Sequence, residues 1–263
     1  MPRVRLDSLL ADRGLFDSRS RAAAAVLAGD VLLGPGRRRA DKPGQLVPED
    51  LPLDVAQAPP FVSRGGVKLA NALDALGVPV RGRRALDVGA STGGFTDCLL
   101  QRGAGHVAAV DVAYGELHWT LREDPRVTVL ERVNARGLTR EDLPYAPDLV
   151  VADVSFISLA KVLPAVLGCL AAAFDALVMV KPQFEVGRGR IGKGGVVLDP
   201  ALRREVLGDV ARTARGLGAA VMGFAASGLP GPKGNRETFA WLAEAGRAGA
   251  VEDLAAAVAE VDA

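Results

Sequence analysis

The chain has 263 residues, of which 49% are hydrophobic, and its formal net charge is +1. This length allows one large domain or a medium domain with a small one, and the apolar fraction allows a substantial core. The nearly neutral charge excludes a global basic signature, so any nucleic-acid partner must be held by local basic patches. The first residues lack the apolar core of a signal peptide, which predicts a cytoplasmic protein.

Residues 1–56 are predicted to form a separate small α+β module. One short helix begins near Leu6 and ends at Gly14, and a second helix over 19–28 is capped by Ser18. Three short apolar runs that predict strands follow, at 31–34, 45–47 and 53–55. The proline-rich residues 57–62 are expected to be a stiff linker.

Residues 63–263 alternate apolar strands with helical patterns. Strands are predicted at 85–88, 107–112, 127–130, 148–152, 177–180, 219–226 and 237–241. Helices are predicted at 66–76, 95–101, 159–173 and 200–216, and the Ala-rich tail from Glu252 is expected to be a surface helix. Buried, Val-rich strands in such alternation predict a doubly wound parallel sheet, with ligands at the carboxyl ends of the strands.

One stretch has nearly the length and composition of a membrane span. Residues 162–180 carry a single charge, Asp175. However, Pro164 and Gly168 interrupt the stretch and Lys181 follows at once. A core helix followed by a buried strand is therefore favoured, and no membrane partner is expected.

The cysteines and histidines give no sign of a metal site. Cys98 and Cys169 lie inside apolar helical patterns, which favours small buried hydrophobes over a disulfide. His106 and His118 do not form a zinc constellation with them. We therefore expect no bound metal.

The segment Leu86–Phe95 has the pattern of a strand, a glycine-rich turn and the start of a helix. Gly89, Gly93 and Gly94 remove Cβ atoms where the loop must bend and a ligand must approach. The spacing is not G-x-G-x-x-G, which makes a dinucleotide site a poor fit.

Two acidic residues accompany this loop. Asp111 ends the next strand, about 20 residues on, where a carboxylate suits a ribose hydroxyl pair. Asp87 stands just ahead of the turn. Together with the glycine spacing, these residues favour S-adenosylmethionine over NAD as the cofactor.

Asp153 and Lys181 each follow an apolar strand, and the two strands would be neighbours in such a sheet. A structural ion pair is one reading, but the position at the expected ligand crevice favours a functional role. Lys68 and Glu237, taken alone, would be a solvated lysine and an exposed glutamate on an edge strand.

Five segments, in order over nearly the whole chain, resemble the TlyA (hemolysin A-like) family of ribosomal RNA ribose methyltransferases. They are Ser63–Leu69, Asp87–Thr96, Asp148–Ser158, Val180–Gly187 and Gly231–Glu237. Each is weak alone, and jointly they are highly specific. The resemblance implies a Rossmann-like class I methyltransferase body similar to FtsJ/RrmJ enzymes, with a mostly parallel seven-stranded sheet. It also implies a leading S4-like RNA-binding domain.

The resemblance further implies a catalytic tetrad of Lys68, Asp153, Lys181 and Glu237. A ribose 2′-hydroxyl is a weak nucleophile, so its proton must leave as the methyl group moves. Lys181 is expected to be the base or to orient the hydroxyl oxygen, with Asp153 steering it and the other two fixing the geometry. The sulfonium methyl group is already activated, so the chemistry requires no metal.

The expected cofactor contacts come from the glycine loop and the following strand ends. Gly89, Ser91 and Gly93 would hold the methionine moiety, and Asp111 the ribose. Asn134 is placed near adenine, with a turn cap as its alternative role. The full predicted set is Asp87, Gly89, Ala90, Ser91, Gly93, Gly94, Phe95, Asp111, Asn134 and Asp153.

Basic residues are expected to hold RNA. S4-type modules contact phosphates from a helix pair, and the candidates are Arg3, Arg5, Arg19 and Arg21 in the module, with Arg64 and Arg188 beside the site. Arg37–Arg39, in a turn, is a further phosphate patch or serves solubility. The loop carrying Arg188, Arg190 and Lys193 would clamp RNA or act as a mobile lid.

The favoured reading is a monomeric S-adenosylmethionine-dependent methyltransferase that acts on ribosomal RNA. The family points to cytidine 2′-hydroxyls in assembled ribosomal subunits. The alternatives are a non-catalytic RNA-binding or ribosome-assembly factor, a membrane-active hemolysin and a nucleotide-dependent oxidoreductase. The intact tetrad disfavours the first alternative. The absence of a span and of a basic amphipathic helix disfavours the second, and the glycine spacing disfavours the third.

Overall fold

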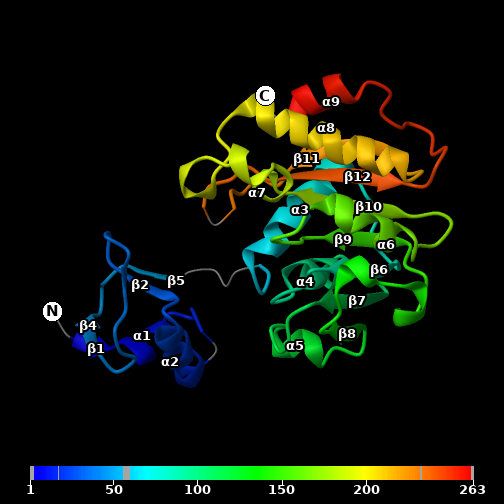
Figure 1. The fold of residues 1–263 in the computed structure, drawn as a ribbon. Coiled ribbons are helices and arrows are strands. Elements are labelled where there is room, and N and C mark those ends of the chain that lie inside the picture. Colours follow the sequence, from blue (N-terminus) through cyan, green and yellow to red (C-terminus); the bar gives the residue numbers. More distant parts are fainter. Residues whose placement is uncertain (1–2, 17, 56–59, 232, 262–263) are drawn as a thin grey trace. The chain divides into compact units, whose positions relative to one another are not determined.

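The computed structural model describes residues 3–16, 18–55, 60–231 and 233–261. The chain divides into two compact units, residues 1–60 and 61–263 (Figure 1). The division falls within the expected linker, whose residues 57–59 lie outside the described part of the chain.

The helices of the first unit begin and end where the sequence predicts. Helix α1 (Leu6–Asp12) is followed by α2 (Arg19–Ala28). The Ser18 hydroxyl accepts the backbone N–H of Arg21, and Gly29 ends α2 with a left-handed φ of 82°. Apolar side chains of both helices, among them Leu6, Leu10 and Val26, form the core of this unit.

The strands of the first unit form two small antiparallel sheets. In the first, β2 (Val31–Leu33) lies between β3 (Arg38–Arg39) and β5 (Leu53–Val55). In the second, β1 (Arg3–Arg5) pairs with β4 (Leu46–Pro48). The prediction of a turn over Arg37–Arg39 was wrong for its last two residues, and β1 was missed. Such short, arginine-rich strands carry no alternating apolar pattern.

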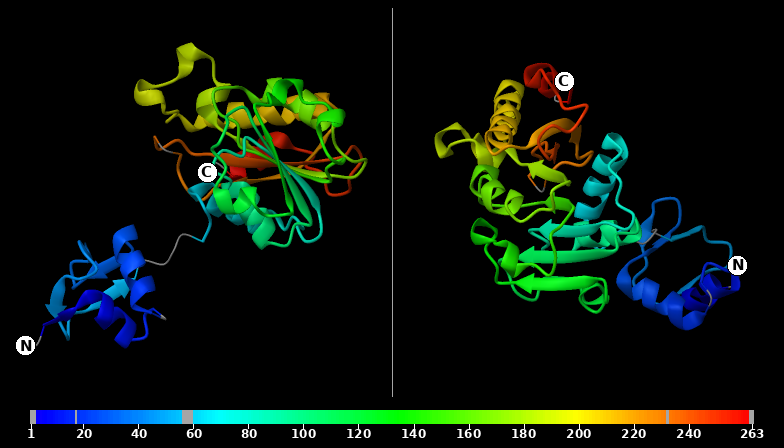
Figure 2. Two further views of the ribbon diagram at one scale, coloured as in Figure 1. Left: turned by 90° about the horizontal axis from the view of Figure 1, so that it is seen from below. Right: turned by 90° about the vertical axis from the view of Figure 1, so that its right-hand side faces the viewer.

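The second unit is built on a seven-stranded sheet of order β11-β12-β10-β9-β6-β7-β8 (Figures 1 and 2). Its strands are β6 (Arg84–Val88), β7 (His106–Asp111), β8 (Val127–Glu131), β9 (Leu149–Ala152), β10 (Asp175–Val180), β11 (Ala220–Ala226) and β12 (Thr238–Ala243). Neighbouring strands are parallel except for β12, which is antiparallel to both β10 and β11. The predicted doubly wound, mostly parallel sheet is confirmed.

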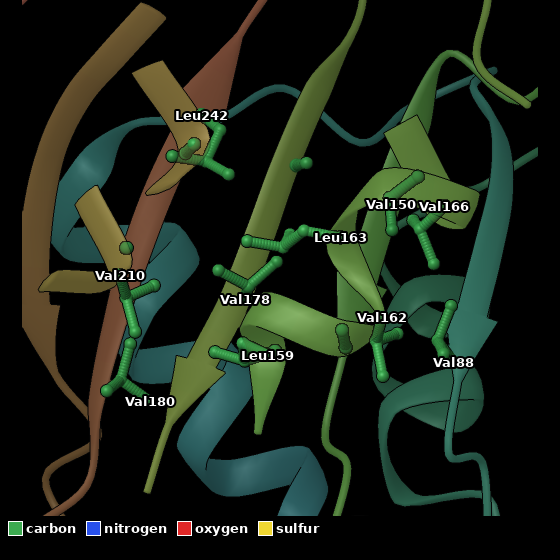
Figure 3. Packing of buried hydrophobic residues seen from close by; sticks show 14 of the residues in the cluster. Val88, Val150, Leu159, Val162, Leu163, Val166, Val178, Val180, Val210 and Leu242 are labelled. Carbon is green, nitrogen blue, oxygen red and sulfur yellow. The ribbon is translucent and has the colours of Figure 1, made fainter. Parts of the chain in front are cut away.

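Helices cover both faces of this sheet, and each face has its own core. One core joins the strands to α6 (Leu163–Leu167), α8 (Pro200–Gly216) and α9 (Leu254–Val261), and part of it is seen in Figure 3. The other joins them to α3 (Arg64–Leu76), α4 (Gly94–Gln101) and α5 (Trp119–Arg122). Within β10, Val178 faces the first core and Leu177 the second, as the pleat requires.

The predicted helix over 159–173 was wrong. A 3₁₀ turn, Leu159–Lys161, precedes the short helix α6, which ends at Leu167. Pro164 sits in the first turn of α6, where its missing N–H costs nothing. In the described part of the chain, no helix combines the length and apolar character needed to cross a membrane.

The strand order places a crossover at β6. From β6 the chain builds outward through β7 and β8 and then returns to add β9 on the other side. At such a switch point the loops after β6 and β9 diverge and leave a crevice at the carboxyl ends of the strands. Gly89, Asp153 and Lys181 directly follow β6, β9 and β10, and Asp111 is the last residue of β7.

Candidate active site

The loop after β6 has a fixed, left-handed backbone. Gly89 has φ of 84°, and a Cβ there would lie 2.5 Å from the carbonyl oxygen of Asp153, so only glycine fits. Ser91 also has a positive φ, 47°, which is strained for a residue with a side chain. Asp111 holds this residue, because its Oδ2 accepts the Ser91 N–H at 2.7 Å.

A cavity of about 380 Å³, the first cavity, opens beside this loop. Gly89, Ser91, Asp111, Asn134 and Asp153 all line it. The Asn134 side chain also accepts a hydrogen bond from the Arg136 N–H at 3.1 Å. The residue therefore caps the following turn and lines the cavity as well. The volume lies within the range of about 300–1,000 Å³ that is typical of small-molecule sites.

A second cavity, of about 370 Å³, adjoins the first and shares Gly89, Ser91 and Asp153 with it. Its remaining lining residues come from the start of α3 (Ser63, Arg64, Gly65 and Lys68), the loop after β6 (Ala90 and Thr92) and the start of α4 (Gly94 and Phe95). A Cβ on Gly94 would lie 2.2 Å from Ser63 Oγ, so this glycine lets the two helices approach closely.

Two residues predicted to touch the cofactor do not line either cavity. Gly93, with φ of 94°, faces α5, where a Cβ would lie 2.3 Å from a methyl group of Leu121. Asp87 is fully buried beneath the loop, and its Oδ2 accepts the Thr96 hydroxyl at 2.7 Å. Both residues therefore fix the conformation of the loop through contacts with α4 and α5, on the side away from the cavities. The sequence cannot distinguish a glycine required by a neighbouring side chain from one required by a ligand.

Asp87 has an altered protonation equilibrium. Its pKa is raised to about 7, chiefly by burial and further by Asp153 and Asp111, although the Thr96 hydrogen bond lowers it. Among the described residues, nothing donates a hydrogen bond to its Oδ1. The folded chain thus holds a proton that the unfolded chain loses near the ordinary value of 3.8.

This proton makes the stability of the fold depend on pH. Because the folded state binds the extra proton, the free energy of unfolding falls as pH rises from about 4 to about 7, by at most about 1.4 kcal/mol per pH unit. In Asp87→Asn this contribution is lost, so the variant gains stability relative to wild type over that window. Urea denaturation from about pH 5 to about pH 8 measures the difference.

The matched control is Asp142→Asn. Hydrogen bonds from Thr139 lower the pKa of that exposed carboxyl, so its contribution changes only in more acidic solution. A difference between Asp87→Asn and wild type that stays constant over the measured window would contradict the assignment.

Two ion pairs join the four residues of the predicted tetrad. Lys68, on α3, pairs with Glu237, just before β12, and both are buried, with exposed fractions of 7% and 3%. Lys181, after β10, pairs with Asp153, after β9. Lys181 also donates to the Ser155 hydroxyl at 2.8 Å. The parallel pairing of β9 with β10 brings the second pair together.

A third cavity, of about 370 Å³, lies against these pairs and shares Ser155 and Phe156 with the first cavity. Its wall contains Lys181 and Glu237 together with Ser155, Phe156, Gln183, Phe184, Ile191, Gly195, Lys233 and Asn235. Asp153 and Lys68, the partners in the two pairs, line the second cavity. Each ion pair therefore connects a residue of the first two cavities to a residue of the third.

The predicted RNA-binding arginines fall in different places. Arg3, Arg5, Arg19 and Arg21 are exposed on the first unit. Arg5 and Arg19 both approach the carboxylate of Asp7, at 2.7 and 3.5 Å, and Arg5 lowers the pKa of Asp7 to about 2. In the second unit, Arg64 lines the second cavity and donates to the Pro230 carbonyl at 2.8 Å.

The predicted basic clamp is only partly described. Arg190 pairs with Glu205 of α8, at 2.7 and 2.6 Å, which holds its guanidinium on the protein. Arg188 and Lys193 belong to 3₁₀ turns, and their side chains lie outside the described part of the structure.

Three residues of the site were not predicted from the sequence. They are Ser155, which accepts from Lys181, Phe156, which is 91% exposed with φ of 64°, and Glu185. Glu185 bonds Ser158 and the Leu159 N–H. All three lie within segments singled out from the sequence, but a hydroxyl, a phenyl ring or a carboxylate in a loop has no distinguishing spacing.

The described residues hold no cluster of histidine, cysteine and acidic side chains suited to a metal ion. Cys98 and Cys169 are buried and unbridged, as predicted.

Comparison with known proteins gives consistent matches. A family model described as FtsJ-like methyltransferase matches residues 61–244. The 16S/23S rRNA (cytidine-2′-O)-methyltransferase TlyA of Mycobacterium tuberculosis is 54% identical over 242 residues, which cover 91% of this chain and 90% of that protein. YqxC of Bacillus subtilis, provisionally named an rRNA methyltransferase, is 44% identical over 235 residues, which cover 89% and 83%.

Solved structures show the same architecture. A Streptococcus thermophilus protein, provisionally named a hemolysin, is 37% identical with a TM-score of 0.73, over 99% of this chain and 96% of that chain. An S-adenosylmethionine-dependent methyltransferase from Mesorhizobium loti shares the fold alone, at 16% identity and a TM-score of 0.52, over 69% of this chain and 100% of that chain.

Proposed function

Because this chain belongs to the FtsJ-like methyltransferase family and is a methyltransferase, we propose that it transfers a methyl group from S-adenosylmethionine to a cytidine 2′-hydroxyl in ribosomal RNA. The substrate is the one named for the Mycobacterium tuberculosis relative. One observation carries the proposal: two Lys–acid pairs stand between the paired first and second cavities and the third.

The first and second cavities suit an adenosine-bearing methyl donor. Gly89 leaves room for a ligand against the backbone, and the Ser91 turn is fixed by Asp111. Asp111 and Asn134 would face the ribose and the adenine, and Ala90, Gly94 and Phe95 would line the methionine side. When bound, S-adenosylmethionine supplies an activated methyl group.

The third cavity suits a nucleotide acceptor. Lys181 and Glu237 put polar groups in its wall, and the rings of Phe156 and Phe184, 5.1 Å apart, offer apolar faces against which a base can lie. A ribose in this cavity would have its 2′-hydroxyl near Lys181, opposite the cofactor side of the Asp153 pair.

The chain's own contribution is positioning and proton handling. Lys181, as the neutral amine, would orient the 2′-hydroxyl oxygen and receive its proton as the methyl group moves, and so become the ammonium. Asp153 holds the Lys181 ammonium, and the Ser155 hydroxyl fixes the other side of that nitrogen. The buried Lys68–Glu237 pair keeps the wall between the cavities rigid and polar without adding net charge.

We propose that the first unit is the S4-like RNA-binding domain. Its exposed arginines come from β1 and the first turn of α2, and such a surface neutralises phosphates. A ribosomal RNA substrate also implies a cytoplasmic location.

Removal of the α2 arginines should weaken binding mainly through electrostatics. In the double variant Arg19→Ala with Arg21→Ala, we expect RNA affinity to fall and the slope of log K against log salt to shrink by about 1 per lost phosphate contact. Fluorescence titration with an rRNA fragment at several salt concentrations measures both quantities. Arg212→Ala, which removes a surface arginine paired with Asp209 on α8, is the control. An unchanged slope would place RNA binding elsewhere.

The test of the activity is transfer of labelled methyl groups to unmethylated ribosomal subunits. Label mapped to a cytidine 2′-oxygen is the expected result. Cofactor binding without any transfer to either subunit would favour the non-catalytic assembly factor. Label on a base would overturn the proposed acceptor.

A further inference from the structure

The segments that carry Asp153 and Lys181 are joined by the ion pair between these residues and by a second set of hydrogen bonds made by Glu185. The β9 loop comprises residues 153–158, and the short helix α7 (Pro182–Glu185) begins directly after Lys181. At the end of α7, Glu185 Oε2 accepts the Ser158 hydroxyl at 2.6 Å, and Oε1 accepts the Leu159 N–H at 2.8 Å. Both carboxylate oxygens are thus used to tie α7 to the end of the β9 loop.

Elsewhere the β9 loop is held by a backbone hydrogen bond at its start and by apolar contacts, in which Val154 and Ile157 pack against the core and the Phe156 ring lies beside that of Phe184. The first residue of the loop is held where the Asp153 N–H bonds the Val88 carbonyl at 2.9 Å. Between the two ends, Phe156 adopts a left-handed φ of 64°, a strained conformation that persists only when its surroundings impose it. Leu159 donates its backbone N–H to Glu185, and its side chain is buried in the core seen in Figure 3.

Glu185 is not an ordinary surface carboxylate. Burial raises its pKa, against the lowering effect of the bonds from Leu159 and Ser158. Its place in the site comes from the single turn of α7, which separates it from Lys181. A shift of the β9 loop relative to α7 would change the distance from Asp153 and Ser155 to the Lys181 nitrogen.

From this geometry we infer that Glu185 is a positioning residue for the methyl-transfer reaction, which braces the β9 loop against α7 and so fixes Asp153 and Ser155 around Lys181. The inference rests on the proposed function for its kinetic consequence. Glu185 itself lines none of the three cavities, so its effect must pass through the groups that it holds.

Three variants separate positioning from simple stability. Glu185→Ala removes both hydrogen bonds, and we expect kcat to fall about 10–100-fold, the size of effect that a misplacement of about 1 Å produces. Glu185→Gln keeps one amide oxygen for the Leu159 N–H and can donate to Ser158, so we expect kcat to return to within about threefold of wild type. Glu244→Ala is the matched control, because Glu244 accepts the Phe174 N–H at 3.0 Å at the opposite end of β10. It should lower the melting temperature and leave kcat unchanged.

Hydrogen exchange by mass spectrometry provides a readout that needs no activity. In Glu185→Ala, the segment 153–161 should exchange at least about tenfold faster than in wild type, while Glu244→Ala leaves it unchanged. A wild-type kcat for Glu185→Ala, or an unaltered exchange rate in 153–161, would overturn the positioning role of Glu185. Absence of methyl transfer by the wild-type protein, with the exchange result as expected, would count against the proposed function and not against this positioning role.

Discussion

Lys181→Ala is expected to slow methyl transfer strongly while leaving cofactor binding intact. General acid–base groups contribute about 10²–10⁴-fold to rate, so kcat should fall by about that factor. The separation of effects follows from the cavities: Lys181 lines the third cavity and neither of the first two. Single-turnover transfer of labelled methyl groups measures the loss, and calorimetric titration with S-adenosylmethionine measures binding.

Two further lysine variants sharpen this test. Lys181→Arg keeps a cation beside Asp153 but cannot give up its proton, so it should be nearly as inactive as the alanine variant if Lys181 acts as the base. Lys161→Ala, at an exposed position of the 3₁₀ turn before α6, should have wild-type kcat. Full activity in Lys181→Ala would remove this residue from the mechanism.

Glu237→Ala is expected to destabilise the fold as well as inactivate it. The substitution leaves the Lys68 ammonium buried without its carboxylate, and breaking one side of a buried ion pair costs about 3–5 kcal/mol. Urea denaturation should show this loss in the free energy of unfolding. The melting temperature should fall by about 2–4 °C for each kcal/mol.

A double replacement distinguishes the stability effect from the catalytic one. Apolar residues in place of both charges are often neutral or stabilising, so Lys68→Met with Glu237→Leu should recover most of the stability that Glu237→Ala loses. Methyl transfer should remain lost. A double variant as unstable as Glu237→Ala would show that the unpaired charge is not the cause, and an active one would remove the pair from the site.

The large sheet could be predicted because its strands are buried on both faces. Runs such as 107–110 and 149–152 are apolar without alternation, which favours parallel strands. The two-residue strand Arg38–Arg39 and the single turn of α5 carry no such signal, because they are too short to show a period.

For the site, the sequence likewise places residues that local patterns mark and cannot show contacts between distant residues. Asp153 and Lys181 end apolar strands, so their side chains fall at the crevice by topology alone. The pairing of Lys68 with Glu237 depends on two residues 169 positions apart, and no local pattern reveals that contact. Sequence position also placed Asp87 at the cofactor, whereas the alternation of β6 turns its side chain toward α4, away from the cavities.

The position of β12 has a consequence for how the enzyme matures. β12 follows the other six strands of this sheet in the sequence, yet it lies inside the sheet, between β10 and β11. A growing chain therefore cannot close this half of the sheet until residues 238–243 have been made, and contacts of such long sequence separation form slowly. Glu237 arrives with that strand and neutralises Lys68 only then. We expect that catalytic competence is acquired in a single late folding step, so incomplete chains carry the cofactor loop but no working site.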